Sequence, residues 1–405
     1  MSKILFVTSE CFPFCKSGGL GDVAGSLPKA LNLLGNDVRV VLPRYWAIDV
    51  NKYGFTVALG TMGVPMGRET IWCRVLTCER DSVKYYFIEH DNSFGRSGLY
   101  DDGKWEYFDN AERFAFFSKA ALQLAKDIKF KPDVVHVNDW QTALIPAYLK
   151  NHYLHDPFFA DTSSVLTIHN LAYQGVFPGK KYDSLDLGQE HFVESKFESW
   201  GKVHFLKGGI FFADSINAVS PSYAEEILTP QGGMGLAPYL VSRKEDVYGI
   251  LNGVDYDHWS PKVDDLIPEK FYPTKMKGKK TCKKELQKEF LLREEENTPV
   301  IGIVTRFTSQ KGLQLLVPIV RDVVREMAVQ FVFLGCGDKH IEDFFGHLPA
   351  VAPGRIGAWI GFDNRKAHLI EAGSDFFLMP SMYEPCGLNQ IYSMKYGTLP
   401  IVRDV

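Results

Sequence analysis

The ten residues KSGGLGDVAG, at positions 16–25, place a lysine and four glycines at the mouth of a predicted helix. An apolar run typical of a buried strand, ILFVT (4–8), lies before them. After them, apolar residues recur at helical spacing as far as Gly35, a helix stop signal. The stretch therefore predicts a strand–loop–helix unit, the building block of an α/β sheet. Its glycines raise the question of what the loop binds.

Two kinds of ligand compete for this loop. Gly19, Gly21 and Ala24 match the G-x-G-x-x-A turn of dinucleotide-binding folds. That turn follows its strand directly and needs an acid after the second strand, whereas here about ten residues intervene and the second strand (37–42) ends in LPR. An NAD site is therefore disfavoured. A phosphate site fits better, because backbone amides, a helix N-terminus and Lys16 all favour an anion, and a flexible turn with a surface lysine is the other alternative.

The remainder of the chain alternates buried strands and helices in two series. The first series has strands at 4–8, 37–42, 133–137, 164–169 and 215–219 and helices at 111–126 and 221–228. The second has strands at 299–306, 330–335, 355–361 and 375–380 and helices at 312–326, 339–346, 364–373 and from about Leu388. This predicts two Rossmann-like α/β domains, 1–247 and 248–405, with parallel sheets and a deep cleft between them. The aromatic-rich segments 50–110 and 175–210 are interpreted as insertions on the first domain.

Composition limits the functional classes. A chain of 405 residues is too long for one ordinary core, and 45% apolar with 23% charged residues is typical of globular proteins. The net charge of −4 gives no reason to expect nucleic acid or an anionic membrane as a partner. The start resembles a strand rather than a signal peptide, and the seven cysteines form no CxxC pair, so a reduced, cytoplasmic location is expected. Six lysines at 275–284 favour a solvated helix start or linker over a binding patch.

Polar side chains follow two further strands of the first domain. VNDW (137–140) presents Asp139, and TIHNLAYQG (167–175) presents His169 and Asn170. Each residue has an ordinary alternative interpretation, because an aspartate after a strand is often a helix cap and a histidine is often a hydrogen-bonded core residue.

Two motifs of the second domain occupy equivalent positions. TRFTSQKG (305–312) places Arg306 and Lys311 after a strand, and MYEPCGLNQ (382–390) places Glu384 before a helix. A surface cation and a turn acid are the alternatives. Arginine and lysine together suit a diphosphate, whose growing charge they can stabilise as it leaves a sugar. No DxD-type acidic pair lies at these positions, so neither a metal nor another cofactor is expected.

Five motifs in order, KSGGLGDV, HVNDW, TIHNLAYQGVF, TRFTSQKGL and EPCGLNQIYSMKYGTLPIVR, resemble those of bacterial glycogen synthases and plant starch synthases. The resemblance runs from residue 3 to the last residue. It implies a GT-B-type retaining glycosyltransferase that moves glucose from a nucleotide sugar to the 4-hydroxyl of an α-1,4-glucan. ADP-glucose is favoured over UDP-glucose as the donor, and the oligomeric state is left open.

The resemblance also implies roles for individual residues. Those implied to bind the donor are Lys16, Gly18, Gly19, Asp22, Asn252, Phe362, Cys386 and Gly387, with Phe362 stacked on the nucleobase. Arg306 and Lys311 would neutralise the leaving diphosphate, and Glu384 would hold the glucose hydroxyls. His169 would lie beside the anomeric carbon and Asp139 near the sugar and acceptor, while Tyr100 and Asn170 are acceptor candidates.

No carboxylate stands out as a covalent nucleophile, so attack on the same face as the leaving group is favoured and Glu384 is interpreted as a positioning group. The family continues beyond GTLPIVR, which leads us to expect a truncated second domain, less stable than one extended through the missing helices. Two other functions stay open at this point: another GT-B glycosyltransferase with a different donor or acceptor, and an inactive nucleotide- or glucan-binding fragment.

Overall fold

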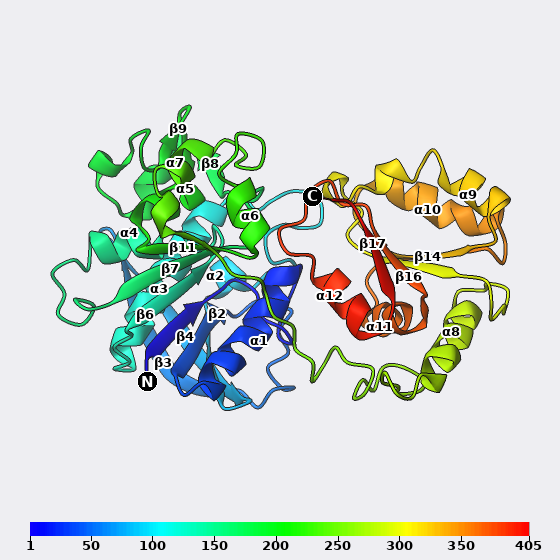
Figure 1. Cartoon of the computed structure of the whole chain (residues 1–405). Coiled ribbons are helices and arrows are strands. Elements are labelled where there is room, and N and C mark those ends of the chain that lie inside the picture. Colours follow the sequence, from blue (N-terminus) through cyan, green and yellow to red (C-terminus); the bar gives the residue numbers. More distant parts are fainter. Residues whose placement is uncertain (405) are drawn as a thin grey trace. The chain divides into compact units, whose positions relative to one another are not determined.

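The computed structural model describes residues 1–404 and divides into two compact units, Met1–Gly253 and Val254–Val405. Each unit has its own sheet of mainly parallel strands with helices packed against it (Figure 1). This agrees with the predicted α/β class, and the two units are described separately below.

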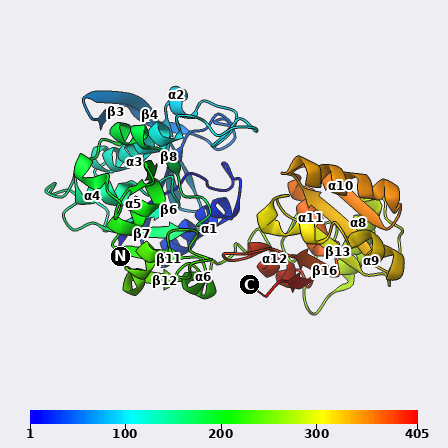
Figure 2. The ribbon, with the colours of Figure 1, turned by 90° about the horizontal axis from the view of Figure 1, so that it is seen from above.

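The first unit is built on a nine-stranded sheet. Its strands are β1 (Lys3–Val7), β2 (Asp37–Pro43), β3 (Thr56–Met66), β4 (Glu69–Arg80), β5 (Val83–Glu89), β6 (Val134–Asn138), β7 (Ser163–Ile168), β11 (Ser215–Ala218) and β12 (Val247–Gly249). They are ordered β12-β11-β7-β6-β1-β2-β5-β4-β3, with β3 and β4 at one edge and β12 at the other (Figure 2). Strand β1 is central, and its last residue Val7 lies opposite Val41 of β2 and Val137 of β6.

The interpretation of 50–110 as an insertion is wrong, because β3, β4 and β5 extend the central sheet. Strand β5 pairs in parallel with β2, while β4 and β3 pair antiparallel, so this edge also departs from the predicted all-parallel sheet. The composition of β4 explains the error: its buried residues Cys73, Val75, Leu76 and Cys78 are interrupted by Arg74 and Thr77. A strand that is buried on one face alternates, whereas the prediction relied on continuous apolar runs.

The helices of the first unit connect these strands. They are α1 (Gly19–Leu33), α2 (Asp91–Phe94), α3 (Asn110–Asp127), α4 (Ile145–Lys150), α5 (Phe205–Phe212), α6 (Pro221–Glu226) and α7 (Ala237–Val241). Helix α3 is largely buried, with Phe114, Phe117, Ala121 and Leu124 fully enclosed. Within 175–210, β8 (Val176–Pro178), β9 (Glu198–Ser199) and β10 (Lys202–His204) form a small separate antiparallel sheet.

The second unit is a five-stranded parallel sheet. Its strands are β13 (Val300–Val304), β14 (Gln330–Gly335), β15 (Ile356–Ile360), β16 (Phe376–Met379) and β17 (Leu399–Val402), ordered β15-β14-β13-β16-β17. Its helices are α8 (Lys277–Glu289), α9 (Val320–Glu326), α10 (Lys339–Val351), α11 (Asn364–Gly373) and α12 (Leu388–Lys395). Residues of α9 and α10 pack in one core cluster and those of α8 and α11 in another, so the sheet is buried on both faces (Figure 1).

The helix predicted over 312–326 is regular only in its second half, α9. Residues Ser309–Lys311 and Leu313–Leu315 form short 3-10 turns instead. Gly312 between them has a left-handed φ of +68°, and a Cβ there would lie 1.9 Å from the carbonyl oxygen of Pro380. The chain therefore turns sharply against Pro380, the residue after β16, before the helix begins.

The lysine-rich segment is a helix start, as predicted, but two of its lysines are not solvated. Lys279 donates to the carbonyl oxygens of Ala372 (3.1 Å) and Tyr396 (3.0 Å), and burial lowers its pKa to about 8. Lys283 donates to the carbonyl oxygen of Glu296 at 2.8 Å and pairs with Asp375. These lysines hold α8 against its neighbours. Across residues 1–404, no helix is long and apolar enough to cross a membrane.

Candidate active site

In the first unit, the predicted side chains gather at the carboxyl ends of β1, β6 and β7, which are neighbours in the sheet. The end of β6 is tied to the end of β1, because the Asn138 side chain donates to the carbonyl oxygen of Val7 at 3.0 Å. Ligands of open α/β sheets bind at this edge. The topology therefore places the glycine loop, Asp139 and His169 along one edge of one sheet.

The glycine loop places Lys16 against the first turn of α1. The Lys16 ammonium lies 2.7 and 2.9 Å from the two carboxylate oxygens of Asp22, and both side chains are about one-fifth exposed (23% and 18%). A Cβ on Gly21 would lie 2.4 Å from that of Lys16, so only glycine permits this close approach. Gly18 precedes the helix, and a Cβ there would meet no atom within 4 Å. The loop therefore has room for a side chain at Gly18 but none at Gly21.

Sequence reasoning missed Glu10, which holds this loop from inside. The residue is only 3% exposed, and its carboxylate accepts the N–H groups of Ser17 (2.5 Å) and Gly18 (3.2 Å). It also accepts the hydroxyl groups of Ser17 (2.6 Å) and Tyr100 (2.7 Å). The sequence contained the signal that identified Asp139, because Glu10 is also a polar residue that follows a buried strand. The Gly18 amide therefore points at Glu10, while the positive end of α1 begins at Gly19.

Asp139 is a buried acid in strained backbone. Its φ of +55° is left-handed, which is uncommon for a residue other than glycine. Its carboxylate accepts the N–H of His169 at 2.7 Å. Burial, with a smaller contribution from the charge of Glu10, raises the pKa of Asp139 to about 7 against the lowering effect of the His169 and Asn170 amides. Near neutral pH the group is therefore divided between its acid and its anion.

His169 is neutral and has a defined tautomer. Its Nε2 lies 3.0 Å from Oδ1 of Asn138, whose amide nitrogen already donates to Val7. Nε2 therefore carries the proton, and Nδ1 keeps its lone pair. Burial, assisted by His136, lowers the pKa of His169 to about 3. This side chain is a hydrogen-bonding group rather than a cation.

The remaining first-unit candidates lie at the same edge of the sheet. The Asn170 side-chain oxygen accepts the N–H of Ala172 at 3.0 Å, and the Tyr100 hydroxyl is bonded to Ser9 and Glu10. Asn252 lies farther along, where its N–H donates to the carbonyl oxygen of Val219 at 3.2 Å, just beyond β11. The structure thus pairs Lys16 with Asp22, joins Tyr100 to the glycine loop through Glu10, and places Asn252 beside another strand.

In the second unit, the centre of the candidate site is an ion pair across neighbouring strands. The Lys311 ammonium lies 3.0 and 2.8 Å from the two oxygens of Glu384, and Ser381 donates to the same carboxylate at 2.9 Å. The loops after β13 and β16 carry these residues, and the bond from Met382 N–H to the carbonyl oxygen of Gln310 (2.8 Å) joins them. Glu384 is therefore neutralised by a cation in a fixed position.

The other second-unit candidates line the same carboxyl edge. Arg306 follows β13, and Gly387, with φ of +79°, is the residue before α12. The Gln390 side chain donates to the carbonyl oxygen of Cys386 at 3.3 Å. The Cys386–Gly387 peptide lies at the N-terminus of α12. Phe362 follows β15 and is 73% exposed, so its ring is open for stacking. No group of three or more metal-ligating side chains occurs within residues 1–404.

Comparisons with known proteins match this arrangement over the whole chain. Residues 3–242 match the family described as "Starch synthase catalytic domain", and residues 284–405 match "Glycosyl transferases group 1". The chain is 44% identical over 404 residues to glycogen synthase 1 of Geobacter metallireducens, covering 99% of this chain and 80% of that protein. It is 42% identical over 403 residues to glycogen synthase of Geobacillus stearothermophilus, covering 99% and 82%.

A solved structure gives the same result. The catalytic domain of starch synthase IV from Arabidopsis thaliana, bound to ADP and acarbose, superimposes with a TM-score of 0.92 at 30% identity, covering 100% of this chain and 83% of that chain. Sucrose-phosphate synthase from Thermosynechococcus elongatus shares the fold alone, with a TM-score of 0.57 at 16% identity. The GT-B-type fold and the resemblance inferred from the five motifs are confirmed.

Proposed function

The chain belongs to the glycogen and starch synthase family of glycosyltransferases, and we propose that it transfers glucose from ADP-glucose to the 4-hydroxyl of an α-1,4-glucan with retention of configuration. A nucleotide-sugar donor and a glucan acceptor follow from the family. The choice of ADP-glucose is supported by the ADP bound to the Arabidopsis enzyme. The observation that carries the proposal is the Lys311–Glu384 pair at the ends of β13 and β16.

In this proposal the second unit binds the leaving group. Lys311 and Arg306 neutralise the diphosphate as the bond between its oxygen and C1 of glucose breaks. A preorganised donor at such a position contributes about 3–4 kcal/mol to lowering the barrier. Glu384 is paired with Lys311, so it orients the glucose hydroxyls together with the amides of Cys386 and Gly387. The exposed ring of Phe362 stacks on the nucleobase.

The first unit supplies the remaining groups. Lys16, Asp22 and the Gly18–Gly19 segment at the start of α1 bind the diphosphate and the donor sugar. His169, neutral at physiological pH, lies beside the anomeric carbon without adding charge to it. Asp139 contacts the sugar and the acceptor. Asn252, which lies just beyond β11, also contacts the donor.

Retention follows if the acceptor attacks on the face from which the diphosphate leaves. The acceptor O4 forms the new bond to C1, the C1–phosphate bond breaks, and the O4 proton passes to the leaving phosphate oxygen. This scheme needs no protein nucleophile. Glu384, whose charge is held by Lys311, is poorly suited to that role.

Transfer of radiolabelled glucose from ADP-glucose and UDP-glucose to glycogen, without added metal, tests the proposal. We expect incorporation from ADP-glucose that is lost in Lys311→Ala and Glu384→Ala. Preferred incorporation from UDP-glucose would overturn the donor assignment, and no incorporation from either donor would favour a binding protein. A glucosyl adduct trapped on Glu384 and found by mass spectrometry would overturn same-face attack.

A further inference from the structure

Glu10 carries a buried carboxylate to which the proposed reaction gives no role. Its Oε2 accepts the backbone N–H groups of Ser17 and Gly18, and its Oε1 accepts the hydroxyl groups of Ser17 and Tyr100. Ser17 and Gly18 belong to the glycine loop, and Tyr100 belongs to the segment before α3. The carboxylate lies just beyond the central strand β1, and it therefore joins the glycine loop to Tyr100, which is 90 residues from Glu10 in the sequence.

The position of Glu10 is itself fixed by the residues around it. The Thr8 hydroxyl donates to the carbonyl oxygen of Glu10 at 2.8 Å, and the Ser9 and Tyr100 hydroxyls lie 2.8 Å apart. These residues directly follow β1, whose two sides are paired with β2 and β6. Thr8 still donates its N–H to the carbonyl oxygen of Val41 at 3.0 Å, so Glu10 is anchored two residues beyond the last bond to the sheet.

Tyr100 is fixed from the other side by α3. Its carbonyl oxygen accepts the side-chain N–H of Asn110 (3.0 Å) and the backbone N–H of Tyr107 (3.0 Å). The side-chain oxygen of Asn110 in turn accepts an N–H of Arg113 at 2.5 Å. The hydroxyl that Tyr100 offers to Glu10 is thus positioned through its own backbone.

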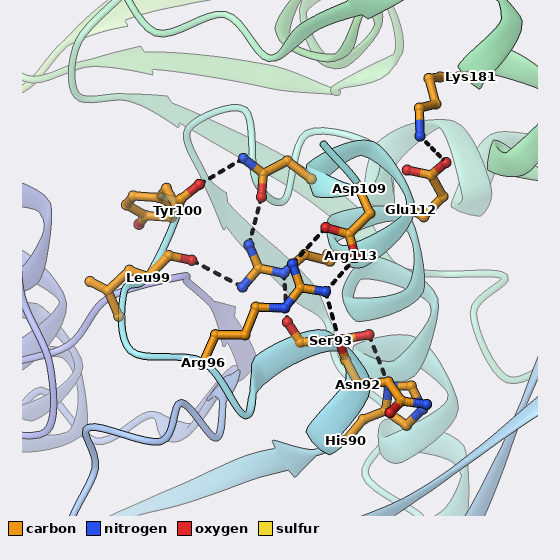
Figure 3. A network of polar contacts seen from close by, with 11 residues as sticks. His90, Asn92, Ser93, Arg96, Leu99, Tyr100, Asp109, Glu112, Arg113 and Lys181 are labelled. Atoms are coloured by element: carbon orange, nitrogen blue, oxygen red, sulfur yellow. Dashed lines mark hydrogen bonds and ion pairs between the residues drawn. The ribbon is translucent and has the colours of Figure 1, made fainter. Parts of the chain in front are cut away.

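Arg113 is the buried centre of this support (Figure 3). It is 1% exposed and also donates to the carbonyl oxygens of Ser93 (2.6 Å) and Leu99 (3.0 Å). Beside it, Arg96 forms a two-pronged ion pair with Asp109 at 2.6 and 2.5 Å. A buried guanidinium is costly unless its donors find acceptors, and here Nε and Nη2 donate to the backbone before Tyr100 while Nη1 donates to Asn110.

We propose that Glu10 is a positioning residue of the donor site. Its carboxylate holds the glycine loop in the shape that receives the diphosphate, and Tyr100, supported by Asn110 and Arg113, holds the carboxylate. This inference rests on the proposed function, because it takes the loop to bind the donor. It also gives the Tyr100 hydroxyl a partner inside the protein rather than on the acceptor.

The role is positional because the contacts of Glu10 can be reproduced without its charge. In Glu10→Gln, the amide oxygen can accept the two backbone N–H groups, and the amide nitrogen can donate to the Ser17 and Tyr100 hydroxyls, which then act as acceptors. Glu10→Ala removes every contact and leaves the two amides without partners. A positioning role therefore predicts that glutamine rescues what alanine loses, whereas a role in charge or proton transfer predicts that both fail.

Steady-state kinetics with ADP-glucose and glycogen test this. We expect Glu10→Ala to lower kcat/KM for ADP-glucose about 100-fold while the KM for glycogen stays within about twofold, and Glu10→Gln to stay within about tenfold of the unsubstituted protein. Glu112→Gln is the matched control, because it removes a carboxylate of α3 that contacts Lys181 rather than the loop (Figure 3). We expect it to change neither constant by more than about twofold.

Tyr100→Phe distinguishes the two roles of that hydroxyl. If it supports Glu10, the KM for ADP-glucose rises by about five- to tenfold, and the double variant with Glu10→Ala is no worse than Glu10→Ala alone. If it contacts the acceptor, the KM for glycogen rises instead and the two effects multiply. The second pattern overturns the proposal, as does loss of activity in Glu10→Gln equal to that in Glu10→Ala.

A binding measurement keeps the test decisive. Titration with ADP, followed by calorimetry, reports the loop without catalysis, and we expect Glu10→Ala to weaken ADP binding while Glu10→Gln does not. If Glu10→Ala fails to fold, Glu10→Gln and Tyr100→Phe carry the comparison alone. Failure of the proposed function can be distinguished from failure of the inference about Glu10, because the unsubstituted protein would then transfer no glucose from ADP-glucose. If that protein is active and Glu10→Ala leaves ADP binding and both KM values unchanged, the inference about Glu10 is wrong.

Discussion

Each unit carries a lysine–carboxylate pair at the carboxyl edge of its sheet, but the two pairs are built differently. Lys16 and Asp22 are six residues apart and meet because a loop folds onto the helix that follows it. Lys311 and Glu384 are 73 residues apart and meet only because β13 and β16 are neighbours in the sheet. Both pairs are similarly buried, so sequence separation, not exposure, is what distinguishes them.

The difference has a consequence for function. The local pair depends on a glycine loop that a third group, Glu10, must hold, whereas the long-range pair is held by two loops bonded to each other. We therefore expect the second-unit pair to be rigid and to act on the transition state. The first-unit pair should act mainly on donor binding.

The largest expected effect is that of Lys311→Ala. If Lys311 stabilises charge on the leaving diphosphate, kcat should fall about 10²–10³-fold, with a smaller change in the KM for ADP-glucose. Initial rates of glucose incorporation into glycogen measure both constants. Lys339→Ala removes an exposed helix lysine paired with Asp343 and serves as the control, with no more than a twofold change expected. A Lys311 variant with normal kcat would remove the rigid pair from the reaction.

The second prediction contrasts two glycines. Gly312→Ala places a Cβ 1.9 Å from the carbonyl oxygen of Pro380 at a left-handed φ, and should destabilise the second unit by about 2–4 kcal/mol. Gly18→Ala meets open space in an extended conformation, and should change stability by less than about 0.5 kcal/mol while weakening ADP binding. Thermal unfolding and ADP titration measure the two effects. Equal melting temperatures for the two variants would contradict the contrast.

Local chemistry explains which parts of the site the sequence predicted. The glycine loop, Asp139, His169 and Lys311 each follow an apolar run, and such runs mark the ends of buried strands. Glu10 was missed although it has the same signal, because its partner Tyr100 is 90 residues away in the sequence. The pairing of buried polar groups depends on topology, which no local pattern contains.

The secondary structure also contains elements that the sequence predicted and elements that it did not. The strands with continuous apolar runs were predicted within one or two residues, as for β6 and β14. Strands β3 and β4 were missed, because glycine and proline in β3 and charged and polar residues in β4 interrupt the apolar runs that the prediction relied on. The first half of the helix predicted at 312–326 is not a regular helix, because the tertiary structure brings Gly312 close to Pro380.

The third prediction compares the carboxylates of the two units. Glu384 is paired with a lysine, whereas Asp139 is buried, accepts amide N–H groups, and has a pKa raised to about 7. The folded pKa lies above the unfolded value of about 3.9, so the stability that Asp139 contributes is full below about pH 4 and is lost as the pH rises through 7. Between pH 5 and pH 7, the unsubstituted protein should therefore lose about 2 kcal/mol relative to Asp139→Asn.

Urea unfolding of both proteins at several pH values measures this difference, since groups shared by the two proteins cancel. The neutral side chain of Asp139→Asn keeps an acceptor for the His169 N–H and lacks the titration. A difference in unfolding free energy that stays constant from pH 5 to pH 8 would show that Asp139 is ionised throughout this range.

The smallest expected effect concerns the local pair. Lys16→Ala should raise the KM for ADP-glucose about tenfold and change kcat by less than about threefold, because the lysine binds the diphosphate before and during transfer to a similar extent. Asp22→Asn should have a weaker effect, since a partly exposed ion pair contributes only about 0–1 kcal/mol. Saturation kinetics with ADP-glucose separate the two constants. If Lys16→Ala lowered kcat as much as Lys311→Ala does, the local pair would act on the transition state too. The contrast between a loop that binds and a rigid pair that stabilises the leaving group would then be wrong.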